Sequence, residues 1–445
     1  MCPSAISDAR APLARLSLRI GAAALLLAPS LALAQSAPEP TTASEDTIAL
    51  LAPTQHSARN PLLRPGREYR GVPVENWMLY PSIIGGATFD DNLVWSKTNR
   101  IAAGGIRLAP DLVAVRDVGG SRTTVFGSVD ARIYPSVGRA DTVSARAGVE
   151  QVWTPTQDLT IKGKLEYNHT ALAISSNYVV NNSVVSTIAS PLIDDKVKGT
   201  VAVQKTFGRM FVGLSLDAAA TGYRAFESST GWVPQSYRDS RVETATVRIG
   251  AWVTPAIYAF GEASGNARDY ASASYASKGY RAVAGVGSDR ISLFRGELYA
   301  GFQQQFYQNY LIGTGSSPIV GGQLYWYPTR WITVRAAIDQ TFTDSSLPTP
   351  GNPGGYPSKV TAARLSAVFK PTKDFTASWR ASYEHTTYLA STRRDDGWRT
   401  GVDLGYQLTS QVEMLAAYEF SKVFSTDPYG GYTRNSVSLG MKYRY

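Results

Sequence analysis

The chain has 445 residues, and 44 Lys and Arg against 35 Asp and Glu give a formal net charge of +9. Its single cysteine, Cys2, excludes a fold held together by disulfides. Beyond the N-terminal region, no segment reaches the roughly 20 apolar residues of a membrane-spanning helix.

The N-terminal 34 residues have the features of a secretory signal peptide. Arg10, Arg15 and Arg19 form a basic region, an apolar stretch follows over 20–33, and residues 32–34 read Ala-Leu-Ala, a cleavage pattern. An uncleaved membrane anchor is the alternative, but the apolar stretch is short for one. We therefore predict a signal peptide over 1–34. An exported chain with dispersed basic charge is not expected to bind nucleic acid.

Residues 35–76 are rich in Ala, Pro, Thr and Ser and show no hydrophobic periodicity. A segment of this kind cannot bury enough apolar surface to fold by itself. We predict that 35–76 is a disordered periplasmic tail.

From residue 77 to the end, apolar and polar residues alternate with a period of two. Residues 159–167 place Leu159, Ile161, Leu165 and Tyr167 on one face of a strand. Eight short turns, many with Pro, Thr or Asp, alternate with nine longer loops; the turn at Gly119-Gly120 is expected to be less tight. This rhythm predicts about 18 strands in an antiparallel up-and-down transmembrane β-barrel over 77–445, in the bacterial outer membrane. A soluble β-sandwich or β-helix is the alternative.

The last ten residues form the clearest of these strands. Val437, Leu439, Met441, Tyr443 and Tyr445 alternate with polar residues or glycine, and the sequence stops on an aromatic side chain. This is typical of the closing strand of an outer-membrane barrel. We predict that Tyr443 and Tyr445 are the signal for the barrel-assembly machinery, and that outer-membrane lipid and lipopolysaccharide surround the wall.

Charged residues within the strands are expected to point into the barrel, because a Lys or Arg facing lipid at the midplane costs about 2–4 kcal/mol. A lumen with this much charge is hydrated, and at about 18 strands it is wide enough for an aqueous channel. The alternative is that most of these charges pair across strands and only stabilise the wall. The lumen-lining candidates are Arg107, Arg132, Arg146, Lys162, Lys164, Arg248, Arg295, Arg335, Arg364, Arg380, Asp130, Glu150, Glu166, Asp339 and Glu384.

Aromatic residues gather beside the short turns, as expected of the girdle at a membrane surface. The predicted members of this girdle are Trp153, Phe207, Trp252, Tyr327, Trp331, Phe369 and Phe375.

Signals for catalysis or metal binding are weak. The three histidines are His56, His169 and His385, and none belongs to a cluster with metal-ligand spacing. His169 near Ser175 and Ser176 leaves open a hydrolase on the barrel wall. We predict no catalytic, cofactor-binding or metal-binding residues.

The first predicted hairpin carries a distinctive motif. A Tyr-Pro-Ser segment with Pro81 and Ser82 is followed by Phe89-Asp-Asp-Asn92, and Pro110 lies in the next strand. This motif resembles the putative β-barrel porin type 2 family of Gram-negative outer membranes. The resemblance implies a porin-like barrel, and many members of that family are associated with exopolysaccharide loci.

The favoured hypothesis is therefore a passive outer-membrane channel. Its more specific version exports a polysaccharide together with a periplasmic partner, and hydrophilic solutes are the other cargo considered. The alternatives are a structural or surface-binding barrel with an occluded pore, in which the loop over 171–194 folds inward, and the hydrolase around His169.

Overall fold

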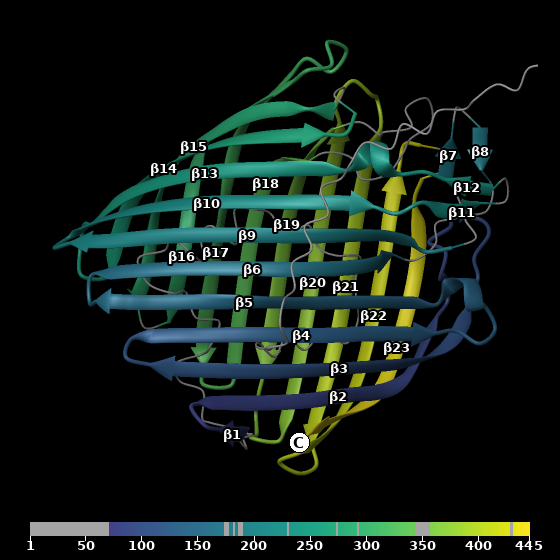
Figure 1. The fold of residues 1–445 in the computed structure, drawn as a ribbon, viewed down its shortest axis with the longest axis horizontal. Helices are drawn as coiled ribbons and strands as arrows, with labels where there is room; N and C mark the ends of the chain where they lie inside the picture. The colour runs from purple at the N-terminus through teal and green to yellow at the C-terminus, as the bar shows by residue number, and fades with distance from the viewer. Residues whose placement is uncertain are drawn as a thin grey trace, which may run out of the picture.

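The computed structural model describes residues 71–445 except 173–177, 181–182, 186–189, 229–230, 273–274, 292, 344–356 and 428–429. Among these residues, eighteen long strands form one closed antiparallel sheet, a β-barrel (Figure 1). The barrel strands are β2 (Trp77–Asp90), β3 (Ala103–Val118), β4 (Ser121–Ile133), β5 (Thr142–Thr156), β6 (Leu159–Leu172), β9 (Leu192–Phe207), β10 (Met210–Tyr223), β13 (Ser240–Trp252), β14 (Ile257–Tyr270), β15 (Ser277–Ile291), β16 (Phe294–Tyr307), β17 (Thr314–Thr329), β18 (Ile332–Thr343), β19 (Ser358–Phe369), β20 (Phe375–Tyr388), β21 (Arg394–Gln407), β22 (Val412–Ser425) and β23 (Tyr432–Arg444).

Consecutive barrel strands pair with each other, and β23 closes the sheet on β2, from Ser82 opposite Arg444 to Asp90 opposite Ser436. The predicted all-β barrel of about 18 antiparallel strands is thus confirmed. Eight connections form what we call the short-turn end, at 119–120, 157–158, 208–209, 253–256, 292–293, 330–331, 370–374 and 408–411. The other nine connections form the long-loop end, where the hairpins β7 (Tyr178–Val180) with β8 (Ser183–Val185) and β11 (Phe226–Ser228) with β12 (Gly231–Val233) lie (Figure 1).

Regular structure begins before the predicted barrel boundary. The strand β1 (Val72–Val74) pairs with Trp77–Leu79 of β2, so the last residues of the predicted 35–76 tail belong to the sheet. The signal peptide over 1–34 and the tail over 35–70 lie outside the described residues, as do residues 173–177, 181–182 and 186–189 of the predicted inward loop over 171–194. Two short 3-10 helices, η1 (Gly138–Ala140) and η2 (Ser236–Arg238), are the helices described, and neither is long enough to cross a bilayer.

Two of the expected turns differ from the structure. The turn at Gly119-Gly120 was expected to be loose, but it is a two-residue hairpin in which Val118 lies opposite Ser121. Both glycines have positive φ, 58° and 75°, which a tight turn with two left-handed residues requires. The turn expected at 288–290 lies further along the chain, because β15 continues to Ile291 through a register shift that adds residues to one strand.

The two faces of the wall differ in composition, because successive residues of a strand point to opposite sides. In β3, Ile106 and Leu108 are exposed, whereas Arg107 between them is buried. The outer face is apolar along the middle of the strands, and its charges lie near the strand ends, as Arg241 and Glu243 do in β13. An apolar outer face around a charged interior is the pattern of a barrel that has lipid outside and water inside.

The predicted aromatic girdle at the short turns needs one correction. Trp153, Phe207 and Trp331 are exposed at this end of the barrel. Trp252 and Tyr258 instead lie directly opposite each other on the interior face, with ring centroids 4.9 Å apart, and Tyr327 is fully buried. The position of Trp252 and Tyr327 beside a turn predicted the correct end of each strand. It did not predict the face, because successive residues of a strand point to opposite sides.

Aromatic rings on the interior face lie over glycines of the neighbouring strand. A Cβ added to Gly287 would lie 2.3 Å from the Tyr258 ring, and one added to Gly250 would lie 2.3 Å from the Phe211 ring. The same relation links Tyr299 with Gly321. The ring fills the space left by the missing side chain, and this cross-strand packing keeps the rings flat against the wall.

Candidate functional site

All fifteen lumen-lining candidates lie on the interior face of the barrel. Each one alternates with outward-facing residues along its strand, and the pairing of neighbouring strands carries that assignment around the sheet. For example, Glu150 lies opposite Lys164, and Ala337 lies opposite Arg364. The structure therefore brings the predicted charges together on one face, where many of them form ion pairs.

Two groups of ion pairs occupy the interior face of β3 to β6. Arg107 donates to Asp130, with Nη2 and Oδ2 2.7 Å apart, and Arg132 lies 3.4 Å from the same carboxylate. On the next strands, Glu166 accepts from Arg146 at 2.8 Å and from Lys164 at 2.7 Å. In both groups one carboxylate meets two cations, and Glu150, opposite Lys164, adds a further carboxylate to the same face.

Arg248 of β13 is the centre of a fully buried group on the interior face of β13 to β16. Its Nη2 lies 2.7 Å from Oε2 of Glu297, and both side chains have no solvent exposure. The Tyr258 hydroxyl donates to the other oxygen of Glu297 at 2.5 Å, and the Arg248 guanidinium lies 3.7 Å from the centre of the Phe260 ring. These contacts compensate part of the cost of burying both charges, while Nε and Nη1 of Arg248 have no hydrogen-bond partner among the described residues. Arg248 therefore belongs to the structure of the wall.

An extended ionic network crosses the seam where the first and last barrel strands meet. Asp90 of β2 binds Arg434 of β23 at 2.6 Å, and Arg434 lies 3.3 Å from Glu419 of β22. Glu419 also lies 3.3 Å from Arg380 of β20, which binds Asp403 of β21. Five charged side chains from five strands are therefore connected across the closed sheet.

The neighbours of Asp90 complete this seam. The Asp91 carboxylate accepts hydrogen bonds from the backbone N–H and the side-chain amide of Asn435, at 2.6 and 2.7 Å. The Asn92 amide donates to the carbonyl oxygens of Ser96 and Thr433, at 2.7 and 2.9 Å. The sequence analysis identified Asp90-Asp91-Asn92 as a distinctive motif but predicted no role for it, because the partners other than Ser96 are more than 340 residues away.

The loops at the long-loop end carry ionic contacts of their own. Arg393 binds Asp395 at 2.7 Å and Asp427 of the next loop at 3.4 Å. Burial opposes the charge of Arg393, but the hydrogen bonds and charge of Asp395 outweigh it, so the pKa of Arg393 lies above its usual value. The guanidinium therefore stays charged and links two loops at the rim.

The two described histidines lie on the outer wall, in equivalent positions near the long-loop end. The His169 Nδ1 lies 2.7 Å from Asp195, which also accepts from the Tyr167 hydroxyl at 2.7 Å. His385, Asp396 and Tyr383 repeat this arrangement at 2.8 and 2.6 Å. The recurrence of Tyr-x-His, at 167–169 and 383–385, is a sequence signal for these two sites.

The hydrolase hypothesis gains no nucleophile beside His169 from the described residues. Ser175 and Ser176 lie outside the described part of the chain, and Ala171 is the next outward residue of β6 after His169. The equivalent His385 does have a hydroxyl nearby, since its Nε2 lies 3.2 Å from the Thr387 Oγ1. Within the described residues, no group of three or more His, Cys, Asp or Glu is arranged to hold a metal ion.

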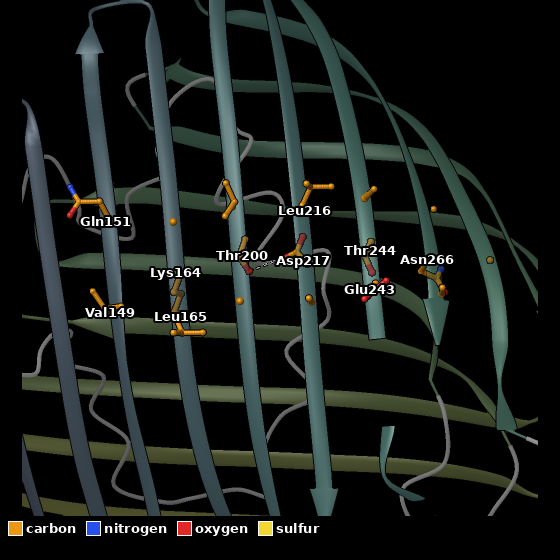
Figure 2. Close-up of a pocket in the computed structure, with 18 residues that line it drawn as sticks. Val149, Gln151, Lys164, Leu165, Thr200, Leu216, Asp217, Glu243, Thr244 and Asn266 are labelled. Carbon is orange, nitrogen blue, oxygen red and sulfur yellow. Dashed lines mark hydrogen bonds between the residues drawn. The ribbon is translucent and has the colours of Figure 1, made fainter. Parts of the chain in front are cut away.

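Two hollows lie on opposite sides of the wall. The larger, of about 910 Å³, is a shallow groove whose lining includes the outward side chains of Val149, Leu165 and Leu216 (Figure 2). Thr200 and Asp217, which share a 2.7 Å hydrogen bond, point to the other side of the same strands (Figure 2). The smaller, of about 180 Å³, lies on the interior face of β18 to β21 and is lined by four arginines.

Comparison with known proteins identifies a family over almost the whole described chain. The model of the family described as putative beta-barrel porin 2 matches residues 64–445. No curated protein matches the chain. Among solved structures, Pseudomonas aeruginosa OccK5 (OpdH) is 10% identical, with a TM-score of 0.43 over 84% of this chain and 99% of that chain. Acinetobacter baumannii OccAB3 is 10% identical, with a TM-score of 0.38 over 84% and 100% of the two chains. The siderophore receptor PirA from Acinetobacter baumannii is 8% identical, with a TM-score of 0.41 over 84% and 81%.

Proposed function

The chain belongs to the putative beta-barrel porin 2 family, and from this premise we propose that it is a passive, non-enzymatic channel of the bacterial outer membrane. The observation that carries this proposal is the contrast between the two faces of the closed wall. Charged groups such as Arg107, Lys162 and Arg380 face the interior, while apolar residues cover the middle of the exterior. An interior of this kind is stable when it is hydrated, because partly exposed charges need water as well as ion partners.

The short-turn end is assigned to the periplasm. Short periplasmic turns and longer outer loops are the usual asymmetry of such barrels, and the chain has eight of the former and nine of the latter. Both ends of the barrel domain then face the periplasm, with Tyr443 and Tyr445 exposed on the outer face of the last strand, where assembly machinery and lipid can reach them.

The cargo we favour is a hydrophilic polymer, an exopolysaccharide delivered by a periplasmic partner, and small hydrophilic solutes are the simpler alternative. The family resemblance of the first hairpin supports the polymer, and the charged interior is compatible with both. Deletion of the gene tests the choice. Loss of released and surface-bound polysaccharide, restored by complementation, supports export, whereas unchanged polymer leaves a general solute channel.

A barrel with an occluded pore is the second candidate, and one observation favours it. Buried residues of three loops pack together at the long-loop end, among them Leu93, Tyr134 and Phe226. A packed cap of this kind could restrict the entrance. Conductance in a planar lipid bilayer separates the two candidates, since only the open channel passes ions.

A further inference from the structure

Four arginines form a regular pattern on the interior face of four consecutive strands. In one row across the sheet, Arg335, Ser366 and Arg380 lie opposite one another in β18, β19 and β20. In the next row, two residues away along the strands, Arg364, Ser382 and Arg399 lie opposite one another in β19, β20 and β21. Arginines and small residues therefore alternate in both directions.

The small residues leave space between the guanidinium groups. The resulting pocket, of about 180 Å³, is lined by these four arginines, by Ser366 and Ser382, and by neighbouring apolar residues. No carboxylate is part of this lining. Since one water molecule occupies about 30 Å³ in the liquid, the pocket has room for an oxyanion together with a few water molecules.

The carboxylates around the pocket are engaged to different degrees. Asp403 binds Arg380, and Glu419 lies between Arg380 and Arg434, at 3.3 Å from each. Asp339, on the side of β18, accepts a hydrogen bond from the Tyr299 hydroxyl at 3.0 Å. Glu384, two residues beyond Ser382 in β20, accepts a hydrogen bond from Thr386 at 3.4 Å.

Arg399 differs from the other three arginines. Arg380 is held by two carboxylates, and Arg335 donates to Gln323 at 3.4 Å and lies 5.8 Å from the Tyr325 ring centre. For Arg399, the described residues supply no ion pair or hydrogen bond to the side chain. Its guanidinium is partly buried and borders the pocket, so it is the group best placed to accept an external anion.

We propose that this arginine pocket is a binding subsite for the oxyanion groups of an acidic polysaccharide, such as uronate carboxylates, inside the barrel. The subsite deepens and rests on the proposed channel function, because it gives the transported polymer a charge class. Guanidinium groups bind carboxylates through two parallel hydrogen bonds, which gives affinity and orientation at once. The serine hydroxyls add donors to the same space.

Direct binding tests the subsite without depending on conductance. Tetragalacturonate is titrated calorimetrically into the folded full-length protein in a non-ionic detergent, with neutral maltotetraose and monomeric galacturonate as comparisons. We expect saturable binding of tetragalacturonate, none of maltotetraose and much weaker binding of the monomer. Equal affinity for the monomer would overturn the polymer as the source of the anion, and absence of tetragalacturonate binding would overturn the subsite.

Variants locate the binding. Arg399→Gln removes the charge of the arginine without an ion pair, so the fold should persist, and affinity should fall roughly tenfold, as expected for loss of a charge-assisted hydrogen-bond pair. Arg399→Lys keeps the positive charge, so its affinity for tetragalacturonate should fall less than that of Arg399→Gln. The matched control is Arg146→Gln, which removes another interior arginine while leaving Lys164 on Glu166. An equal loss in Arg146→Gln would show a general charge effect and overturn the local subsite.

Bilayer recording of the same proteins separates the two proposals. A conducting channel that does not bind tetragalacturonate keeps the channel function and overturns the subsite. A folded protein that binds the oligomer but stays silent supports the subsite and contradicts the open channel.

Discussion

Asp90 and Arg434 are 344 residues apart in sequence and form an ion pair of 2.6 Å across the seam that closes the barrel. Asp90 is 2% exposed and Arg434 is 7% exposed, so the pair is almost completely removed from solvent. The pair lies on the interior face, beside the last hydrogen-bonded residues of β2 and β23. It therefore joins the first strand of the barrel to the last at the end nearest the long loops.

Replacement of Asp90 by Ala should destabilise the barrel strongly. Removing one partner of a buried pair leaves the other charge uncompensated, which typically costs about 3–5 kcal/mol; Glu419, 3.3 Å from Arg434, should reduce that loss. Urea unfolding in lipid vesicles measures the change. The exposed pair of Lys205 and Asp158 is the control, since Asp158→Ala removes a solvent-screened pair and should destabilise the barrel much less than Asp90→Ala. Equal stability of the two variants would contradict a structural role for the seam.

The Asn92 amide gives an independent test of the same seam. Its two donated hydrogen bonds, to Ser96 and Thr433, are enclosed by the long loops. Asn92→Ala leaves both carbonyl oxygens without this donor, so the free energy of unfolding should fall by about 1–3 kcal/mol. Asn92→Asp, which cannot donate, should be no better than Ala. Wild-type stability in Asn92→Asp would show that the donated hydrogen bonds contribute nothing.

The aromatic rings over interior glycines predict a difference between two glycines of neighbouring strands. A Cβ at Gly287 would overlap the Tyr258 ring at 2.3 Å, whereas a Cβ at Gly261 meets nothing within 4 Å. Gly287→Ala should therefore destabilise the barrel by about 1–3 kcal/mol, the usual effect of overpacking. Gly261→Ala should be neutral or slightly stabilising. Similar urea midpoints for both variants would be incompatible with rings packed against the wall.

Ion selectivity should follow the charges of the interior face. Lys162→Glu with Lys164→Glu reverses two interior cations, so the reversal potential in a salt gradient should shift towards cation selectivity. When Lys164 is replaced, Arg146 still binds Glu166, whereas Arg380 is left unchanged because it connects Asp403 and Glu419 in the network at the seam. Lys278→Glu, on the outer face of β15, is the control and should leave the potential unchanged. No shift in the double variant would show that these lysines do not line the conducting path.

Much of this architecture is predictable from local sequence. Alternation with a period of two, punctuated by turns rich in Pro, Thr and Asp, depends on neighbouring residues alone, so the strand number and the inward direction of residues such as Arg107 and Lys164 follow from it. The same reasoning placed Trp252 and Tyr327 at the right end of their strands. It failed on their face, because an aromatic residue near a turn can pack inside as well as outside.

The long-range contacts could not be predicted in this way. Apart from Ser96, the partners of Asp90, Asp91 and Asn92 lie in the last strand, and the closed sheet alone determines which residues of the two ends meet. The arginine pocket depends on the register of β18 to β21, since a shift by two residues would separate Arg364 from Arg399. The register shift in β15 similarly places the turn after Ile291. The residues at 288–290, where the turn was predicted, carry no local signal of that shift.

The central claim is that the closed wall surrounds a water-filled path, and single-channel recording tests it most directly. Purified, folded protein is inserted into a planar lipid bilayer, and current is measured as a function of voltage and KCl concentration. The channel account predicts discrete insertion steps. Their current should be linear in voltage, and their conductance should rise with salt concentration. Persistent electrical silence of protein that is shown to be folded and inserted would contradict it and favour the occluded barrel.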